Sequence, residues 1–381
     1  MSTHIRLSRL NAQAKKTTLQ AVGGHLENTD DDSKSRSVVS WKIMLVLVVS
    51  LAEILLNIGR VTPDSSLYIG LSKYFLGQQS RYDQIVVMRP AIPWMAAILS
   101  PFFGLQLSYG LINASFWIGG VFVTYRLTRL LLANENQAVL ASLLYTTSRP
   151  LLDYGAAVLT DAAGYFFIGL IVYLTFLREE EPQERASYYA DGFLAGLALL
   201  FRETALFALV FMLMRRVQKR KALIETLLPI GVVAIILIAY LHALGLNVGI
   251  YFHKYDVASL SYTTDTWNAV WWVETLVVAF SPLIIFFPLG LASTGKRRIA
   301  LLGCLVVLLP VSLIWPVMSM RFSFCMYPCV IPVIVLGFHK FLSKFGSRYE
   351  ALLVSLTFAA IVLYNNYKVA DLFGLLPLLH S

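Results

Sequence analysis

Residues 39–59 read VSWKIMLVLVVSLAEILLNIG, and this stretch decides the fold class. As an α-helix, its 21 residues extend about 31 Å, which is enough to cross the hydrocarbon core of a membrane. The run is continuously apolar and lacks the alternation typical of a membrane-spanning β-strand. Lipid admits only helices and closed barrels, so we predict a transmembrane helix here.

The composition extends this prediction to the whole chain. Hydrophobic residues make up 57% of the 381 residues, charged residues make up only 14%, and the mean hydropathy is +0.68. A soluble domain carries about 25% charged residues, so a water-soluble enzyme is excluded, as are a disordered chain and a disulfide scaffold. The three cysteines lie in apolar runs, and we interpret Cys304, Cys325 and Cys329 as packing residues.

The positions of the basic residues predict the topology. We predict an all-α polytopic membrane protein with eleven spans: the first, and ten more near 108–130, 136–150, 161–177, 188–201, 204–217, 222–243, 268–291, 298–315, 323–339 and 350–367. Alternation from a cytoplasmic N-terminus then places five segments inside, and all of them carry Lys or Arg: 126–129, 178–185, 215–221, 295–298 and 340–348. The net charge of +9 therefore fits the positive-inside rule and indicates no nucleic-acid partner.

The domain organisation follows from these spans. Residues 1–38 are polar, have no cleavage site and are predicted to be a disordered cytoplasmic tail. One transmembrane domain covers 39–367 and includes an outer loop at 60–107, and residues 368–381 form a short outer tail. Within the loop, PAIPWMAAILSPFFG (90–104) has three prolines and is too short to cross comfortably, so we predict a re-entrant or interfacial helix.

Ionisable residues in or beside apolar spans are costly and mark functional sites by default. By the topology above, all of these residues lie at the outer face or in the outer part of a helix, and this clustering is the main functional signal of the sequence. A transporter should instead place charges near the midplane and at both gates, so the clustering counts against one. The set comprises Glu53, Asp64, Asp153, Asp161, Arg202, Glu203 and Arg321.

Two acids in this set each allow two interpretations. Asp64, in RVTPDSSLY, either caps the following helix or acts as a general base at the membrane surface. Asp161, in VLTDAAGYFF, either caps its helix or joins Asp64 in positioning an acceptor or holding a divalent cation with waters.

The arginines also have alternatives. Arg202 and Glu203, in LALLFRETALF, lie between two short apolar runs that fit a helical hairpin near the outer face. They either neutralise each other, or the arginine binds an anion and the glutamate orients it. Arg321 is a lone outer arginine, and its partner is lipid phosphate or a phosphate-linked substrate. Lys73 and Arg89, in the first outer loop, are solvated in the simplest interpretation.

The order of these motifs resembles a known superfamily. One span precedes TPDSSLYIGLSKYF, MRPAIPWMAAILSPFFG, a span ending in YRLTRLL, LTDAAGYFF, GLALLFRETALF and MRFSFCMYPCVIP. This order resembles the GT-C polytopic glycosyltransferases, in the branch of the dolichyl-phosphate-mannose protein mannosyltransferases and the lipid A aminoarabinose transferases. The resemblance covers residues of about 40–340, and the sidedness of the motifs is its specific part.

The resemblance implies a function and a site. A sugar would pass from a polyprenyl-phosphate donor to an acceptor on the non-cytoplasmic side, and residues 39–367 would be the catalytic domain. Asp64 and Asp161 would be the two acids of the family, and Arg89 with Pro90 would be its Arg-Pro element. Arg202, Arg321, Arg89 and Lys73 would bind the donor phosphate, with Glu203 and Tyr68 in support.

The expected partners are the donor, a lipid, glycan or protein acceptor, and membrane lipids, in a plasma, inner or endoplasmic-reticulum membrane. No cofactor is indicated, and a divalent metal stays open. Many relatives carry two adjacent acids in the first loop, whereas Ser65 and Ser66 follow Asp64 here, which favours a single base. The alternatives are a transporter or flippase of a lipid-linked or anionic solute, a surface-polysaccharide polymerase or ligase, and a non-catalytic membrane subunit.

Overall fold

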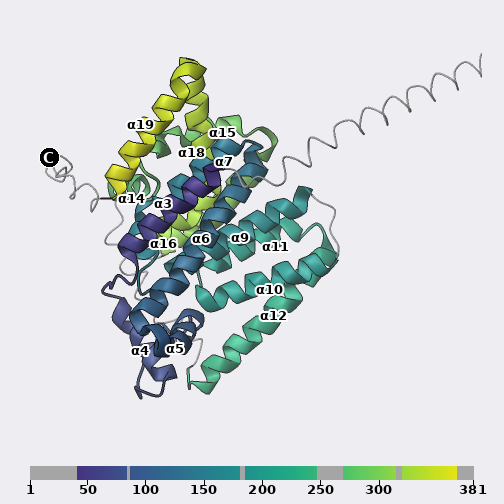
Figure 1. The fold of residues 1–381 in the computed structure, drawn as a ribbon. Coiled ribbons are helices and arrows are strands. Elements are labelled where there is room, and N and C mark those ends of the chain that lie inside the picture. Colours follow the sequence, from purple (N-terminus) through teal and green to yellow (C-terminus); the bar gives the residue numbers. More distant parts are fainter. Residues whose placement is uncertain (1–40, 84–85, 181–184, 247–268, 315–319, 367–381) are drawn as a thin grey trace, which may run out of the picture. The chain divides into compact units, whose positions relative to one another are not determined.

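A computed structural model describes residues 41–83, 86–180, 185–246, 269–314 and 320–366, and in these ranges the chain forms helices and no strand (Figure 1). The predicted all-α class is confirmed. The elements are α3 Trp41–Asn57, α4 Ser65–Phe75, α5 Ala91–Phe103, α6 Leu105–Leu132, α7 Glu135–Thr146, α8 Arg149–Tyr154, α9 Asp161–Glu180, α10 Arg185–Phe201, α11 Ala205–Arg216, α12 Arg220–Ala243, α14 Ala269–Phe280, η1 Pro282–Phe286, α15 Phe287–Ser293, η2 Gly295–Arg297, α16 Arg298–Ile314, α17 Met320–Ser323, η3 Phe324–Met326, α18 Tyr327–Leu342, η4 Ser343–Phe345 and α19 Ser347–Asn365.

The chain divides into two compact units after Leu47, inside α3. Of the first unit, the structure describes only the opening turns of that helix. The second unit holds the rest of the fold. The predicted tails at 1–38 and 368–381 lie outside the described residues, so the predicted domain boundaries remain predictions.

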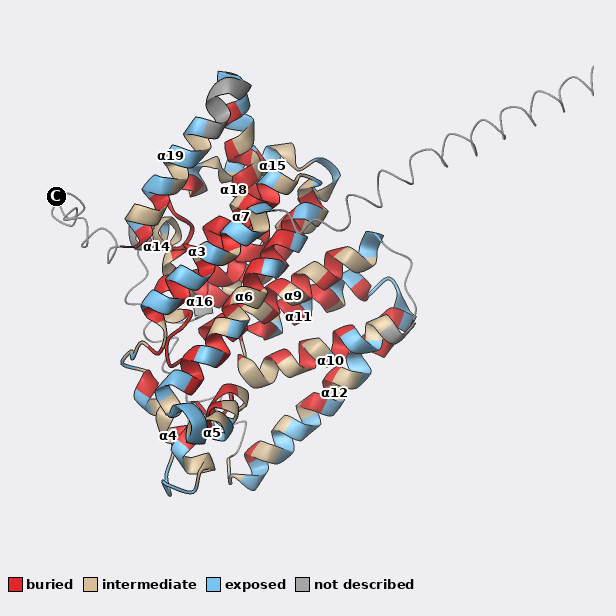
Figure 2. Cartoon of the chain, in the orientation of Figure 1, coloured by how far each residue is buried: buried red, intermediate tan, exposed pale blue. Residues whose placement is uncertain are grey.

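Helices α6, α7, α9 and α18 form the packed centre of the second unit, and Figure 2 shows their largely buried surfaces. Glycines allow this packing. A Cβ atom at Gly169 of α9 would lie 1.8 Å from the hydroxyl of Tyr327 in α18, and one at Gly290 of α15 would lie 1.8 Å from the carbonyl of Val333. Small residues let membrane helices approach closely, which is how such helices gain van der Waals contact in lipid.

Four elements are long and apolar enough to cross a membrane: α6, α9, α12 and the stretch Met320–Phe345. A fifth is added if the bent pair Trp272–Phe280 and Pro282–Ser293 counts as one span. These helices support an integral membrane protein. The predicted number of eleven spans is not confirmed, because helices such as α7, α10 and α11 have at most 17 residues.

The apolar run predicted at 268–291 is not one continuous helix. It bends by 102° between α14 and η1. Ser281 has a φ of 63°, in the left-handed region, and its hydroxyl accepts a hydrogen bond from the backbone N–H of Leu283 at 3.3 Å. Pro282 follows, and a proline disfavours the helical conformation of the preceding residue. The hydropathy of the run gives no sign of this bend.

The short helix predicted at 90–104 is present as α5, with Gly104 after its last residue. Its outward side chains include Trp94, Ile98 and Phe102, so it carries an exposed apolar face. The helix packs on α4 and α6, which brings the first loop next to the span that follows it. Its predicted position at the membrane surface remains a prediction.

Candidate active site

Asp64 immediately precedes α4, but its side chain does not cap that helix. The turn is held by other groups: the backbone N–H of Ser65 donates to the carbonyl of Thr62 at 3.0 Å, and the N–H of Thr62 donates to the hydroxyl of Ser65 at 2.8 Å. The carboxylate of Asp64 instead accepts a hydrogen bond from Nη1 of Arg321 at 2.8 Å. It is 49% exposed, so solvent or a substrate can reach it.

Asp161 opens α9 and is completely buried. One oxygen, Oδ2, lies 2.8 Å from Nη1 of Arg202, and the other, Oδ1, lies 3.1 Å from Nε of Arg321. A buried carboxylate is stable only when it is paired and hydrogen-bonded, and here two guanidinium groups meet that need. Asp161 is therefore the residue that brings Arg202 and Arg321 together.

Arg321 lies on the short helix α17 and is bound on several sides. Its guanidinium contacts the carboxylates of both Asp64 and Asp161. It also lies 5.1 Å from the ring centre of Tyr154 and 5.5 Å from that of Phe322, distances at which a cation and an aromatic face attract each other. The hydroxyl of Tyr165 donates to the backbone carbonyl of Arg321 at 2.8 Å. Arg321 thus links the exposed acid to the buried acid.

Arg202 follows α10 and is 1% exposed. Its Nη1 lies 3.3 Å from the hydroxyl of Thr160, and its buried Nε has no hydrogen-bond partner among the described residues. The aliphatic part of the side chain crosses α9 at Gly164, where a Cβ atom would lie 2.4 Å from Cδ of Arg202. A glycine at this position therefore makes room for the arginine beside Asp161.

Glu203 does not pair with Arg202, as one interpretation of the sequence proposed. It pairs with Arg89, whose Nε lies 2.5 Å from Oε2 and whose Nη2 binds Oε1. Burial by itself would raise the pKa of Glu203, but the charge and hydrogen bonds of Arg89 outweigh it and hold the pKa below its ordinary value. Nη1 of Arg89 donates to the hydroxyl of Tyr68, which lies 3.4 Å from that of Thr160. Thr160 therefore lies between Tyr68, which is bound to the Arg89–Glu203 pair, and Arg202, which is bound to Asp161.

Three residues singled out from the sequence do not join this cluster. Lys73, in the last turn of α4, is exposed and has no ion pair within the described ranges. Glu53 accepts a hydrogen bond from the side chain of Asn366 at 2.6 Å. Asp153 lies 2.9 Å from Arg60 and 2.7 Å from Arg149, so it forms ion pairs with two arginines outside the cluster.

Sequence reasoning missed several residues of the cluster. Nothing in the sequence around Tyr154 marks it as a site residue. Thr160 is adjacent to Asp161 and could have been noted for that reason. Phe322 lies 5.7 Å from the guanidinium of Arg202 and close to that of Arg321, a position that only the packing reveals. Nothing in the sequence distinguishes Gly164 from the other glycines of the chain.

The charges of the cluster balance. Asp64, Asp161 and Glu203 face Arg89, Arg202 and Arg321, and Asp64 is the most exposed of the six. The arrangement does not fit a divalent metal. Its two candidate ligands, Asp64 and Asp161, both bind the guanidinium of Arg321, and a metal ion would have to displace that side chain. In the described part of the chain, no three His, Cys, Asp or Glu side chains come together in a group that could hold a metal ion.

Residues 86–244 match the family model described as dolichyl-phosphate-mannose-protein mannosyltransferase. Four of the six charged residues of the cluster fall in this range, and Asp64 and Arg321 fall outside it. No curated protein matches the chain by sequence.

Solved structures share the fold. ArnT from Cupriavidus metallidurans bound to undecaprenyl phosphate is 13% identical, with a TM-score of 0.64, over 89% of this chain and 74% of that protein. The same enzyme in the apo state is 13% identical, with a TM-score of 0.58, over 78% of this chain and 59% of that protein. The oligosaccharyltransferase of Archaeoglobus fulgidus in the apo form is 14% identical, with a TM-score of 0.57, over 88% of this chain and 56% of that protein. The chain thus spans between about half and three quarters of these proteins. The matches confirm the resemblance to the GT-C glycosyltransferases, and at this identity the solved structures show the fold alone.

Proposed function

We propose that this chain is a membrane glycosyltransferase that moves a sugar from a polyprenyl-phosphate donor to an acceptor hydroxyl on the non-cytoplasmic side. The observation that carries the proposal is Arg321, held between the buried Asp161 and the exposed Asp64. The mannosyltransferase match and the shared fold of ArnT support the same chemistry. The acceptor is a lipid, a glycan or a protein.

The carboxylate of Asp64 serves as the general base. It takes the proton of the acceptor hydroxyl, whose oxygen attacks the anomeric carbon of the donor sugar. The bond between that carbon and the phosphate oxygen breaks, and the phosphate leaves with the electron pair. Such a direct displacement inverts the anomeric carbon.

The arginines neutralise the leaving phosphate. The planar guanidinium of arginine can hold two phosphate oxygens at once. Arg321 is the member of the cluster that contacts the exposed Asp64, and the buried Nε of Arg202 has no hydrogen-bond partner among the described residues. Asp161 positions both side chains. Arg89 and Glu203 hold Tyr68 beside Thr160, and Lys73 would meet the phosphate from the surface of α4.

The membrane arrangement is part of the proposal. Eleven crossings, the catalytic domain at 39–367 and the outer loop at 60–107 would place Asp64, Asp161, Arg202 and Arg321 at the outer or luminal face. The helices α6, α9 and α12 lie where spans are predicted, which supports this arrangement, whereas the predicted span at 268–291 is bent. The shorter helices would cross together with their neighbours in the chain.

One observation favours the transporter alternative, and another counts against it. A second group of charges lies at the far end of α9, around Asp191, so the charges do not gather at one end only. Between the two groups, however, α9 carries the buried apolar residues Phe167, Ile168, Ile171 and Val172. These apolar side chains separate the two groups of charges along α9, so an enzyme remains the better proposal. A polymerase or ligase of surface polysaccharide differs from it only in the acceptor.

The test is turnover by the purified protein in lipid nanodiscs, assayed against a panel of polyprenyl-phosphate sugars and acceptors. We expect one donor to be consumed with release of polyprenyl phosphate. Asp64→Asn keeps the shape of the side chain and removes the base, so turnover should fall at least about a hundredfold. Asp83→Asn, in the same loop and outside the cluster, is the matched control and should keep normal turnover. Near-normal turnover by Asp64→Asn would contradict the assignment, and transport without donor cleavage would favour the alternative.

A further inference from the structure

The chain segment that leads to Asp64 is joined to the segment that leads to Asp161. The backbone N–H of Gly59 donates to the carbonyl of Ala156 at 2.9 Å. A second backbone hydrogen bond, 3.0 Å long, runs from the N–H of Val158 back to the first segment. Because each acid follows its joined segment within a few residues, these bonds limit how far one acid can move relative to the other.

A single helix holds both segments through two amide side chains. Gln106 and Asn113 of α6 are seven residues apart, so they lie on the same side of the helix, about two turns from each other. Nε2 of Gln106 donates to the carbonyl of Gly59 at 2.6 Å. Nδ2 of Asn113 donates to the carbonyls of Ala157 and Leu159 at 2.7 and 2.9 Å. Both segments are therefore fixed against one helix.

The helix lies close to the backbone of the first segment between the two amides. A Cβ atom at Gly110 would lie 2.6 Å from Cγ1 of Ile58 and 2.9 Å from the backbone nitrogen of Gly59. Asn113 is completely buried, and its Oδ1 has no partner among the described residues, so all hydrogen bonds of its side chain go to the second segment. Buried carbonyls that lose such a donor stay unpaired, which is costly.

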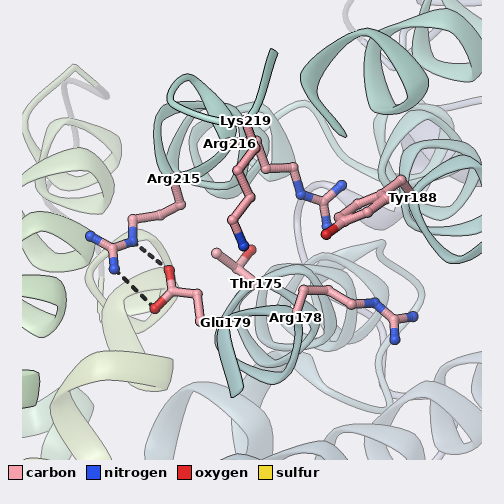
Figure 3. A pocket seen from close by; sticks show the side chains of 7 residues that line it. All are labelled: Thr175, Arg178, Glu179, Tyr188, Arg215, Arg216 and Lys219. Atoms are coloured by element: carbon pink, nitrogen blue, oxygen red, sulfur yellow. Dashed lines mark hydrogen bonds and ion pairs between the residues drawn. The ribbon is translucent and has the colours of Figure 1, made fainter. Parts of the chain in front are cut away.

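The other end of α9 is held by charged pairs instead. Arg178, Glu179 and Arg215 line an open pocket there, and Figure 3 shows Arg215 paired with Glu179. These two side chains are joined by hydrogen bonds of 2.5 and 2.9 Å, and Arg178 lies 3.0 Å from Asp191. At the end that carries Asp161, neutral amides hold the backbone. They add no charge that would compete with the acid for its two arginines.

We propose that Asn113 and Gln106 are positioning residues of the transferase. From α6 they set the separation of Asp64 and Asp161, and with it the alignment of Arg321, whose guanidinium binds both acids. The hydrogen bonds of the two amides go to backbone carbonyls, so the amides act through the acids and do not contact the donor. This inference rests on the proposed function, because that function assigns Arg321 to the donor phosphate.

The test is equilibrium binding of undecaprenyl phosphate to the full chain in lipid nanodiscs, with the thermal midpoint of each variant as the measure of folding. Asn113→Ala removes both donors, so the Kd should rise about fivefold, the size expected of a residue that acts on a ligand through its neighbours. Gln106→Ala removes one donor at a partly exposed position, so the Kd should rise about threefold. Gln106→Ala carries the test if Asn113→Ala does not fold.

Asn134→Ala is the matched control. Asn134 caps α7 just beyond the other end of α6, where its Oδ1 accepts from the backbone N–H of Gln137 at 3.1 Å. Loss of this cap should lower the thermal midpoint and leave the Kd unchanged. Arg321→Lys gives a second comparison. Lysine has no planar fork to misalign, so adding Asn113→Ala to this variant should change the Kd by less than about twofold.

The inference fails on any of three results. An unchanged Kd in both Asn113→Ala and Gln106→Ala would show that the amides do not position the site. An equal rise in Asn134→Ala would mean that any loss of stability weakens binding. A full effect of Asn113→Ala in the Arg321→Lys variant would mean that the amide does not act through Arg321.

Turnover of the wild-type protein, measured separately, distinguishes this inference from the proposed function. Normal binding of undecaprenyl phosphate without turnover of any sugar donor would count against the transferase activity, and the ratios between the variants would still decide the role of the amides. Failure of the wild-type protein to bind undecaprenyl phosphate would overturn both.

Discussion

At the scale of single residues, Arg321 is the centre of the candidate active site. It binds a carboxylate that solvent reaches and a carboxylate that solvent does not reach. A donor phosphate that approaches the guanidinium would replace Asp64 as its outer partner. Donor binding would then leave the carboxylate of Asp64 available for the acceptor hydroxyl, while Asp161 keeps the arginine in position.

This role predicts the behaviour of variants at the same position. Arg321→Lys keeps the positive charge but loses the planar fork, so the Kd for the donor should rise at least about tenfold with little loss of folding. Arg321→Ala should weaken donor binding further. Isothermal titration with a polyprenyl-phosphate sugar measures the Kd, and the thermal midpoint reports folding. Normal donor affinity in both Arg321→Ala and Arg202→Ala would remove the phosphate assignment.

Glu203 makes a prediction about pH. Its pKa lies below its ordinary value of 4.5 because Arg89 stabilises the carboxylate. The pair therefore contributes stability above the pKa of the unfolded chain, and this contribution is lost as the pH falls through the lowered pKa of the folded state. Tm should thus exceed that of Glu203→Gln at pH 6 to 7, and the difference should shrink below about pH 4.5. A difference that grows on acidification would contradict this account of the pair.

At the scale of elements, α9 links the two charged sites of the molecule. Its first residue, Asp161, holds two arginines at one end, and Arg178 lies in the pocket at the other. The close passage of Arg202 over Gly164 sets how the α10–α11 turn meets this helix. The geometry of the candidate active site therefore depends on helix packing as much as on the charged groups themselves.

Gly164→Ala tests this dependence. The added methyl group would overlap Cδ of a fully buried arginine, so we expect a loss of about 1–3 kcal/mol in stability and a weaker affinity for the donor. Gly231→Ala in α12 is the control, because no atom lies within 4 Å of the position that its methyl group would take and alanine favours a helix. Thermal midpoints and donor titrations of both variants give the answer. Equal behaviour of the two variants would show that Arg202 is free to move aside.

At the scale of the whole molecule, the charge pattern predicts which side each loop faces. The loop at 215–221 should be cytoplasmic and the loop at 60–107 should be outside. Single cysteines at Gln78 and Gln218 can be labelled with a membrane-impermeant reagent in intact cells. We expect labelling at position 78 only, against a low background, since the native Cys304, Cys325 and Cys329 are buried. Labelling from outside at 218 but not at 78 would reverse the topology and place the site on the wrong face.

The sequence alone determined where most helices lie and which residues deserved attention. Hydropathy is a local property, so the positions of α6, α9 and α12 followed from apolar runs without any knowledge of packing. Asp64, Asp161, Arg202 and Arg321 stood out because an ionisable group near lipid is costly. The motif order was enough to indicate the GT-C resemblance that the comparisons confirmed.

Only the tertiary structure decided which charges meet. Arg321 reaches Asp64 across 257 residues, and Arg89 reaches Glu203 across 114. Any arginine can pair with any carboxylate, so the choice depends on how the helices pack, and no local pattern encodes it. The bend at Ser281 and the sharing of Asp191 by two arginines have the same origin. Each depends on a contact between segments that the sequence does not place side by side.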